Sequence, residues 1–328
     1  MILAGDIGGT NARFAFFEAA GDKLAVVSEA VFPSRQYRTL DEIVANLLAT
    51  SGMKPTVACL GIAGPVRYGR VETSNLPWVV EEGKLAAETG IPRVHLLNDL
   101  EANAWGIEVL QDGDLVSLNH VKADPAGNRV VVSAGTGLGE AGLYWDGKRH
   151  LVFASEGGHT DFAPRNDLEI DLLLYLRKRF GRVSYERIIS GPGLVNVYNF
   201  LRDSGHGTEP AWLAEEMSKS DPAAVISTNA AAAKCPLCEH AVDIFVSVYG
   251  AEAGNMALKV MAAGGVFLGG GIAPRMISKF CGPLFLQSFL AKGRMQALLE
   301  TIPVYVIANP KTALLGAARC AASGMAGA

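Results

Sequence analysis

The sequence predicts an α/β protein built of two halves that open on the same motif, and three observations carry this prediction. Residues 2–18 read as a strand, a glycine turn and a second strand, so the turn leads into a strand and not into a helix. A similar arrangement recurs over residues 130–145. The chain has 328 residues, of which 49% are hydrophobic, and is therefore long enough for two domains with separate cores.

The first glycine turn, residues 5–10, reads Gly-Asp-Ile-Gly-Gly-Thr. In dinucleotide-binding and P-loop proteins the glycine turn leads into a helix, whose N-terminus binds the anion. A β-hairpin instead binds phosphate with the backbone N–H groups of the turn itself. The order of elements therefore predicts a phosphate-binding hairpin, in which Asp6 is a candidate Mg²⁺ ligand, directly or through water.

The second glycine turn, residues 135–139, reads Gly-Thr-Gly-Leu-Gly. Internal self-similarity of this kind changes the predicted fold, because two such turns are able to hold one polyphosphate from both sides. The alternative is that these are two unrelated hairpins in an α/β protein.

Charge and hydropathy argue against several classes of protein. The formal net charge is −4 and no run of Lys and Arg occurs, which argues against nucleic acid as the main partner. A strand that starts at residue 2 leaves no room for an N-terminal DNA-reading domain. The longest uncharged run, 260–274, is too short to span a membrane and is interrupted by glycines. Because no signal peptide is evident, we expect a cytoplasmic protein.

The five cysteines are odd in number and mostly lie in apolar sequence, which fits reduced thiols. Cys235 and Cys238 have a metal-like spacing, but no second Cys or His pair completes a zinc site. Between a metal site and a packing role at the start of a helix, the sequence favours packing.

Hydrophobic periodicity places the remaining elements. Further strands are expected at 26–32, 56–63, 93–97, 266–268 and 302–308, and helices at 40–50, 80–89, 167–180, 193–202, 211–217, 240–262 and 310–322. The expected domains are a small α/β domain, residues 1–109 plus 309–328, and a large α/β domain, residues 110–308.

Asn98 and Asp99 stand where a predicted parallel strand gives way to a helix, a place that commonly lines the ligand crevice of such sheets. Asp99 alone reads as an N-cap. It also fits the carboxylate that orients and deprotonates an attacking hydroxyl in phosphoryl transfer. Asn98 offers a donor and an acceptor to neighbouring hydroxyl groups.

The loop 155–162, Ser-Glu-Gly-Gly-His-Thr-Asp-Phe, gathers ionisable groups around two glycines. Glu156 and His159 are suited to sugar hydroxyls, which need acceptors and donors together. A structural or zinc-binding His159 is the alternative, and the lack of a nearby cysteine cluster favours the sugar. Glu186 by itself reads as an acidic group at a helix start, and Asn75 as a turn former.

The segments 5–11, 97–99, 135–139, 156–162, 190–194 and 268–275, taken in this order, resemble those of the bacterial glucokinases, and the likeness runs from residue 2 to the C-terminus. The resemblance implies an actin-like, ribonuclease-H-like fold of two domains, with glucose and ATP-Mg²⁺ in the inter-domain cleft. The Glu-Gly-Gly-His run is also similar to the wider repressor and kinase group, whose His binds zinc with a cysteine cluster. This chain lacks that cluster, which places it in the zinc-free glucokinase branch.

The resemblance also assigns roles. Asp99 is expected to be the catalytic base that takes the proton of the sugar 6-hydroxyl, and a homodimer is expected. The implied sugar ligands are Asn75, Asn98, Asp99, Glu156, His159 and Glu186. The implied ATP-binding residues are Gly5, Asp6, Ile7, Gly8, Gly9, Thr10, Gly135, Thr136, Gly137, Gly269, Gly270 and Gly271, with Asp6 on the metal.

The leading hypothesis is therefore a glucokinase that transfers the γ-phosphate of ATP to the 6-hydroxyl of D-glucose, giving glucose 6-phosphate and ADP in the first step of glycolysis. Alternatives are a kinase for another hexose or amino sugar, or one that takes ADP or polyphosphate as donor. A non-catalytic sugar-sensing regulator or an actin-like assembly protein is the alternative from another class. The intact Asp99 favours catalysis.

Overall fold

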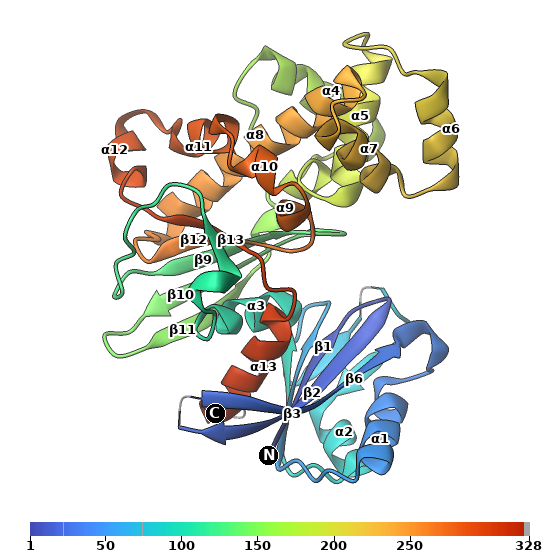
Figure 1. Cartoon of the computed structure of the whole chain (residues 1–328), viewed down its shortest axis with the longest axis vertical. Coiled ribbons are helices and arrows are strands. Elements are labelled where there is room, and N and C mark those ends of the chain that lie inside the picture. The colour runs from blue at the N-terminus through green and yellow to red at the C-terminus, as the bar shows by residue number, and fades with distance from the viewer. Residues whose placement is uncertain (22, 74, 325–328) are drawn as a thin grey trace. The chain divides into compact units, whose positions relative to one another are not determined.

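A computed structural model describes residues 1–21, 23–73 and 75–324 of the chain (Figure 1). The chain divides into two compact units. Unit 1 contains Met1–Asp114, Val152–Ala154 and the described chain from Asn309 onward. Unit 2 contains Leu115–Leu151 and Ser155–Ala308.

Unit 1 is built on a five-stranded sheet of order β3-β2-β1-β4-β7. Its strands are β1 (Ile2–Ile7), β2 (Asn11–Ala20), β3 (Lys23–Pro33), β4 (Val57–Ile62) and β7 (Val94–Asn98). The first three pair antiparallel, whereas β1, β4 and β7 are parallel. A separate antiparallel pair is formed by β5 (Arg70–Glu72) and β6 (Val79–Glu81).

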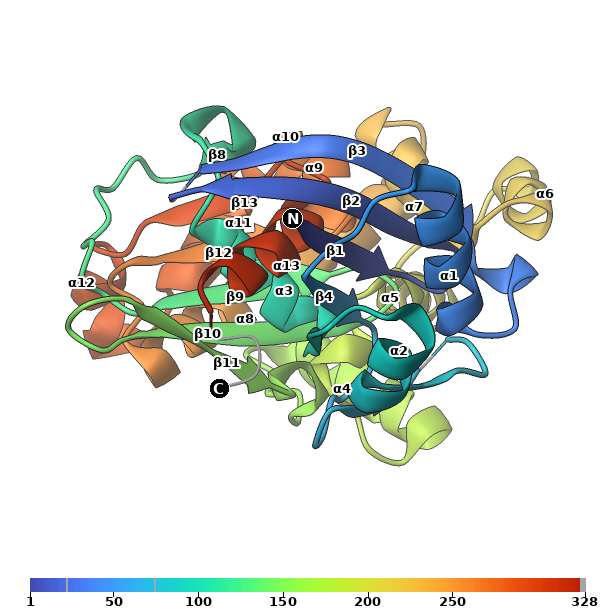
Figure 2. The same cartoon turned by 90° about the horizontal axis from the view of Figure 1, so that it is seen from below.

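Helices cover both faces of this sheet, because successive side chains of a strand point to opposite faces. The helices α1 (Leu40–Ser51) and α2 (Glu82–Thr89) share one core with Leu3 and Phe14. The helices α3 (Asp99–Ile107) and α13 (Thr312–Ala322) share another with Ala4, Phe17 and Cys59. Strand β4 is buried along its whole length, as a parallel strand with helices on both faces must be (Figures 1 and 2).

Unit 2 is built on a six-stranded sheet of order β11-β10-β9-β12-β13-β8. Its strands are β8 (Leu115–Ser117), β9 (Arg129–Ala134), β10 (Leu138–Trp145), β11 (His150–Ser155), β12 (Gly265–Gly269) and β13 (Val304–Ile307). β9 pairs antiparallel with β10 and parallel with β12, which in turn is parallel to β13. In sheet order, β11-β10-β9-β12-β13 thus repeats the arrangement β3-β2-β1-β4-β7 of unit 1, which confirms that the opening motif recurs.

The helices of unit 2 surround one long helix, α8 (Pro236–Val260). The others are α4 (Asp167–Phe180), α5 (Gly191–Asp203), α6 (Ala211–Lys219), α7 (Pro222–Ala231), α9 (Ile272–Arg275), α10 (Ile277–Phe280), α11 (Pro283–Leu290) and α12 (Gln296–Leu299). Single 3₁₀ turns are η1 (Ser34–Gln36), η2 (Asp112–Asp114), η3 (Gly157–His159), η4 (Tyr185–Arg187) and η5 (Gly293–Met295). None of the described helices combines the length and the apolar character needed to cross a lipid bilayer.

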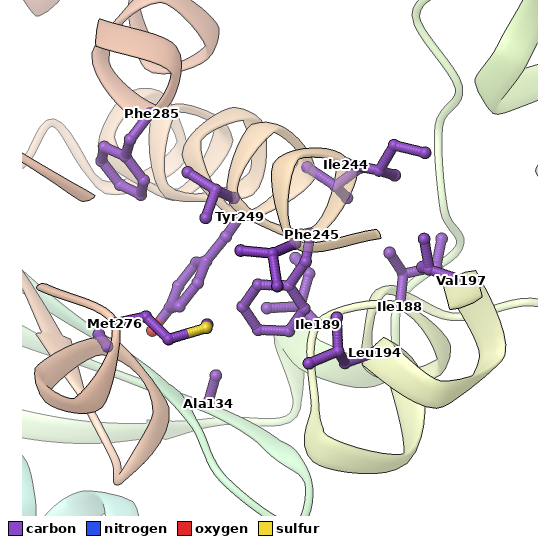
Figure 3. Close-up of a cluster of buried hydrophobic side chains, with 14 of the residues drawn as sticks. Ala134, Ile188, Ile189, Leu194, Val197, Ile244, Phe245, Tyr249, Met276 and Phe285 are labelled. Atoms are coloured by element: carbon purple, nitrogen blue, oxygen red, sulfur yellow. The ribbon is translucent and has the colours of Figure 1, made fainter. Parts of the chain in front are cut away.

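Aromatic residues of α8 fill the space between the sheet and the other helices of unit 2. Figure 3 shows Phe245 beside Ile189 and Leu194, and Tyr249 directed toward Met276. The Tyr249 hydroxyl donates a hydrogen bond of 2.7 Å to the carbonyl of Val132 in β9. A buried tyrosine needs such a partner, so this bond fixes α8 on the sheet.

Most predicted elements are present, with shifted ends. Helix α8 begins at Pro236, four residues before the predicted start, and Cys235 stands at its N-cap position. Cys235 and Cys238 are both buried beside apolar side chains, which fits the packing role favoured by the sequence. The pattern missed α7, whose alanine-rich sequence carries little apolar periodicity, and β5, β6 and β8, which are three residues long.

Helices α3 and α13 approach each other closely at two glycines. A Cβ atom on Gly316 would meet the carbonyl oxygen of Ala102, and one on Gly106 would meet the carbonyl oxygen of Thr312. In both cases the obstacle is backbone, which cannot rotate away. The packing of α13 on unit 1 therefore depends on the absence of these side chains.

We expect Gly316→Ala to lower the free energy of unfolding by about 1–3 kcal/mol through overpacking, despite the better helix propensity of alanine. The matched control is Gly83→Ala in α2, where a Cβ meets nothing within 4 Å. That variant should gain roughly 0.5–1 kcal/mol from helix propensity. Chemical denaturation of both variants measures the difference, and equal effects at the two positions would contradict the close contact.

Candidate active site

The first glycine turn joins β1 to β2 in unit 1, and its carbonyl groups are tied to the chain that follows β3. The Gly8 N–H donates to the carbonyl of Asn11 at 3.0 Å. Ser34 donates its hydroxyl to the Gly8 carbonyl at 2.8 Å and its N–H to the Thr10 carbonyl at 3.0 Å. Within the described residues, no hydrogen bond uses the N–H groups of Gly9 and Thr10. These two N–H groups are therefore available to bind an anion.

Asp6 lies directly before this turn, opposite Arg13 in the β1–β2 register. Burial raises the pKa of the Asp6 carboxyl, and the positive charge of Arg13 partly offsets this rise. Burial disfavours the negative charge of this carboxylate, and a bound cation would compensate that charge. Asp6 is therefore a suitable ligand for a hard cation such as Mg²⁺.

The carboxyl ends of three parallel strands bring the candidate residues of unit 1 to one edge of the sheet. Asp6 is at the end of β1, Gly61 near the end of neighbouring β4, and Asp99 follows β7. A Cβ atom on Gly61 would lie 2.8 Å from the Cβ of Ala102 and 3.9 Å from the Cα of Asp99. The missing side chain lets α3 begin close to this edge, as in other open α/β sheets that bind ligands there.

Asn98 is the N-cap of α3, and Asp99 is the first residue of the helix. The Asn98 Oδ1 accepts from the Leu100 N–H at 2.8 Å, and Glu101 completes a capping box by accepting from the Asn98 N–H at 3.0 Å. The Asn98 amide also donates to the Gly64 carbonyl at 2.9 Å. Taken alone, the position of Asp99 in the sequence favours a role as the helix cap. In the structure Asn98 is the cap, and Asp99 Oδ1 accepts from the same Leu100 N–H at 3.1 Å.

Asn75 lies against the first glycine turn, since a Cβ atom on Gly9 would come within 2.8 Å of the Asn75 Cβ. The structure thus brings Asn75 to the turn.

The second glycine turn joins β9 to β10 in unit 2 and is fastened to the start of α5. The Gly135 N–H donates to the Gly137 carbonyl, and the Gly191 N–H donates to the Gly135 carbonyl, each at 2.8 Å. Ser190 caps α5 by accepting from the Gly193 N–H at 2.9 Å and donates its hydroxyl to the Glu186 carbonyl at 2.8 Å. In the described chain the N–H groups of Thr136 and Gly137 enter no hydrogen bond.

Glu156, His159 and Glu186 form a row beside this turn. The His159 Nδ1 lies 3.8 Å from Glu186 Oε1, and the His159 Nε2 lies 4.0 Å from Glu156 Oε2. Glu186 Oε2 accepts from the Leu138 N–H at 3.0 Å, which anchors the row to β10. Glu156 and His159 expose 69% and 54% of their side chains, so their polar atoms are available to a ligand.

A cavity of about 740 Å³ opens in unit 2 next to the second turn. Gly135 and Thr136 lie at its wall, together with the start of α5 at Gly191 and Pro192. Its polar and charged lining consists of Arg179, Asn196, Asn199, Asp221, Ser227 and Arg275. The volume is within the range of sites for small molecules and cofactors.

Of the predicted run Gly269–Gly271, only Gly271 lines this cavity. Gly269 is buried within β12, and a Cβ atom on Gly270 would meet the carbonyl of Ala134. Sequence reasoning missed Asn196, Asn199 and Ser227, which lie on the faces of α5 and α7 and stand in no glycine-rich run. The Ser-Gly-Pro-Gly run at 190–193 was the available signal for α5.

Comparison with known proteins agrees over the whole chain. A family model described as glucokinase matches residues 3–324. The chain is 40% identical to the glucokinase of Nostoc punctiforme over 98% of this chain and 99% of that protein. It is 38% identical to the glucokinase of Marinobacter nauticus over 96% and 95%.

The chain belongs to the glucokinase family. The crystal structure of a glucokinase from an Antarctic psychrotroph superposes with a TM-score of 0.86 at 33% identity and covers 98% of both chains. The glucokinase of Balamuthia mandrillaris, solved in complex with glucose, shares the fold with a TM-score of 0.79 at 23% identity, over 98% of this chain and 93% of that chain. The actin-like α/β fold class predicted from the sequence is confirmed, and with it the class of enzyme, an ATP-dependent hexose kinase.

In this glucokinase family member, Ser190→Ala should cost about 1 kcal/mol of stability, as the loss of an N-cap does. Because the same hydroxyl holds α5 beside the second turn, KM for ATP should rise by roughly fivefold, or about 1 kcal/mol. Thr39→Ala in unit 1 removes the corresponding cap of α1, which Thr39 makes with the Glu42 N–H. The control should lose similar stability with KM for ATP unchanged. Thermal melts and a coupled assay separate the two, and an unchanged KM in Ser190→Ala would contradict the role of α5.

Proposed function

We propose that this glucokinase transfers the γ-phosphate of ATP to the 6-hydroxyl of glucose, with Asp99 as the base. The observation that carries the proposal is the row of Glu156, His159 and Glu186 beside the second glycine turn, in which the N–H groups of Thr136 and Gly137 enter no hydrogen bond in the described chain. A ring of acceptors and donors for hydroxyl groups next to a cradle for an anion is the arrangement that sugar phosphorylation requires.

The nucleotide is proposed to occupy the cavity of unit 2. Its adenosine would lie among α5, α7 and α9, and its phosphates would reach Thr136 and Gly137 of the second turn. The N-terminus of α5, capped by Ser190, adds the positive end of a helix dipole. The first turn, Gly5 to Thr10, is the second proposed phosphate contact, through Gly9 and Thr10.

A magnesium ion fits the residues of unit 1. Asp6 is a carboxylate whose burial disfavours an uncompensated negative charge, and it adjoins the unused N–H groups of the first turn. We propose that Asp6 holds Mg²⁺, directly or through water, and the ion supplies neutralisation of phosphate charge. Asp6 itself contributes by fixing that charge at the end of β1.

The proposed sugar ligands are Glu156, His159 and Glu186 in unit 2 and Asn75, Asn98 and Asp99 in unit 1. Asn98 contributes less freely than the sequence implied, because its amide already serves Leu100 and Gly64. One N–H and one lone pair remain for a hydroxyl. Asp99 is half-buried in the first turn of α3, and its Oδ1 accepts from the Leu100 N–H at 3.1 Å.

Rate in this proposal comes from positioning. Asp99 orients the 6-hydroxyl and accepts its proton as the bond to phosphorus forms, while the backbone donors of the turns hold the phosphate oxygens. The homodimer remains a prediction drawn from the family resemblance, and the cytoplasmic location one drawn from the sequence.

Asp99→Asn should lower kcat by roughly 10²–10⁴-fold, because the amide orients the hydroxyl without accepting its proton. Stability should change by less than about 0.5 kcal/mol, since Asn98 supplies the cap. Asn98→Ala is the contrasting variant, with a loss of about 1 kcal/mol from the cap. Single-turnover kinetics beside a thermal melt make the comparison. Turnover near the parent rate in Asp99→Asn would exclude the base and with it the proposed mechanism.

Glu156→Gln and His159→Ala should each raise KM for glucose by about 1–3 kcal/mol, roughly fivefold to a hundredfold, because a buried hydroxyl loses its partner. KM for ATP should stay nearly constant. Glu215→Gln is the matched control, a surface carboxylate of α6 that pairs with Lys219 at 2.5 Å. Initial rates over a glucose series decide, and a larger change in KM for ATP than for glucose would show that the row is not the sugar site.

A further inference from the structure

Glu140 is a fully buried carboxyl group that the proposed mechanism does not use. It lies on β10, opposite Val132 of β9, just after the second glycine turn. Among the described residues, neither of its carboxyl oxygens has a hydrogen-bond partner. An unpaired buried carboxyl group is costly, so its presence calls for a physical role.

The backbone of the Glu156–His159 loop rests directly on this carboxyl group. A Cβ atom on Gly157 would meet Glu140 Oε2, and one on Gly158 would meet the carbonyl oxygen of Leu138. Strand β10 therefore supports the loop at Leu138 and at Glu140. The loop continues as the single turn η3, in which the His159 N–H donates to the Glu156 carbonyl at 3.0 Å.

Helix α8 carries two ionisable groups, Glu252 and Lys259, that act electrostatically on Glu140. Glu252 is fully buried and lies 3.6 Å from Lys259, and Glu252 Oε2 accepts from the Asn255 amide at 2.8 Å. The same amide donates to the Tyr185 hydroxyl at 3.0 Å. The Tyr249 hydroxyl of α8 donates to the carbonyl of Val132, the β9 residue opposite Glu140 in the register. Because Tyr185 precedes Glu186, this cluster supports both turns that carry the row.

We propose that Glu140 is a positioning residue of the sugar site, which supports the backbone of Gly157 and through it sets the places of Glu156 and His159. The proposal rests on the sugar-binding role proposed above for that row. Glu140 touches neither sugar nor nucleotide in this scheme, and it acts through the loop.

The protonation state of Glu140 gives this support a pH dependence. Burial first, and the nearby Glu252 second, raise the pKa of the Glu140 carboxyl to about 8, against the opposing effect of Lys259. At pH 7 the group is therefore mostly neutral. Above pH 8 it ionises. Because a buried unpaired charge is unfavourable, the Glu140 side chain then moves toward water or toward Lys259. The backbone of Gly157 then loses the support of the Glu140 side chain, and the affinity for glucose falls.

The sign of the stability effect follows from the same pKa. The folded-state pKa lies above the ordinary value of 4.5, so the folded protein keeps a proton that the unfolded chain releases. Stability is thus unaffected below about pH 4.5 and is lost as the pH rises from there to about 8. Glu140→Gln, which is neutral at every pH, should melt at a higher temperature than the parent at pH 8.

The first test is the pH profile of KM for glucose. In the parent enzyme this KM should rise above pH 8, whereas in Glu140→Gln it should equal the parent value at pH 7 and stay flat to pH 9. Glu140→Ala should raise KM for glucose by about tenfold at pH 7 with little change in kcat, as the loss of a supporting partner does. Glu215→Gln, the surface control, should follow the parent at every pH.

The second test uses the contact between Gly157 and Glu140. Gly157→Ala inserts a methyl group against the carboxyl group and should raise KM for glucose strongly. In the Glu140→Ala background that methyl group has room, so Gly157→Ala should add little, and the two changes should be non-additive. Circular dichroism and thermal melts confirm that each variant is folded.

The outcomes separate this proposal from the one beneath it. If His159→Ala raises KM for glucose but Glu140→Gln keeps the alkaline rise of the parent, the positioning role is wrong and the sugar site stands. Additive effects of Gly157→Ala and Glu140→Ala also overturn the positioning role. If His159→Ala leaves KM for glucose unchanged, the sugar site itself is wrong.

Discussion

The hydrogen bond from the Gly191 N–H to the Gly135 carbonyl, 2.8 Å long, is the contact on which the arrangement of unit 2 depends. It uses the acceptor of the second glycine turn and leaves the donors of Thr136 and Gly137 unused in the described chain. It also fixes the start of α5 beside β9, which sets one wall of the cavity. Ser190 extends the same connection to η4, because it bonds to the Glu186 carbonyl. Anion donors, cavity wall and acidic row therefore share one anchor.

At the start of α3, the structural role of capping the helix and the proposed role of accepting a proton fall to two neighbouring residues. Asn98 satisfies the helix terminus and the Gly64 carbonyl with its amide. Asp99 Oδ1 also accepts from the Leu100 N–H, but the residue that caps the helix is Asn98. Were Asp99 itself the cap, the same oxygen atoms would serve helix stability and proton transfer. The order Asn-Asp at this junction separates the two demands.

The sequence was sufficient to predict the fold class and most of the elements, because local sequence patterns indicate the two glycine hairpins and the apolar strands. The residues of the loop 155–162 predicted Glu156 and His159 as sugar ligands, and family resemblance added Glu186. The structure brings these three side chains together. The cavity lining was not predicted, since Asn196 and Asn199 look like ordinary helix-surface residues until α5 is placed beside α7 and α9. Glu140 likewise reads as one more strand residue, and only its burial beneath Gly157 reveals it. Such contacts depend on tertiary packing that local patterns do not encode.

The place of α13 in unit 1 has a consequence for the order of folding during synthesis. The face of the unit 1 sheet that carries Ala4, Phe17 and Cys59 is covered in part by residues 312–322, which the ribosome begins to add about 250 residues after the end of β4. Unit 2, by contrast, is complete once residue 308 has emerged. Nascent chains thus hold an apolar surface of the first-made sheet open until residues 312–322 have been translated. That interval is when association with chaperones or with other nascent chains competes with correct folding.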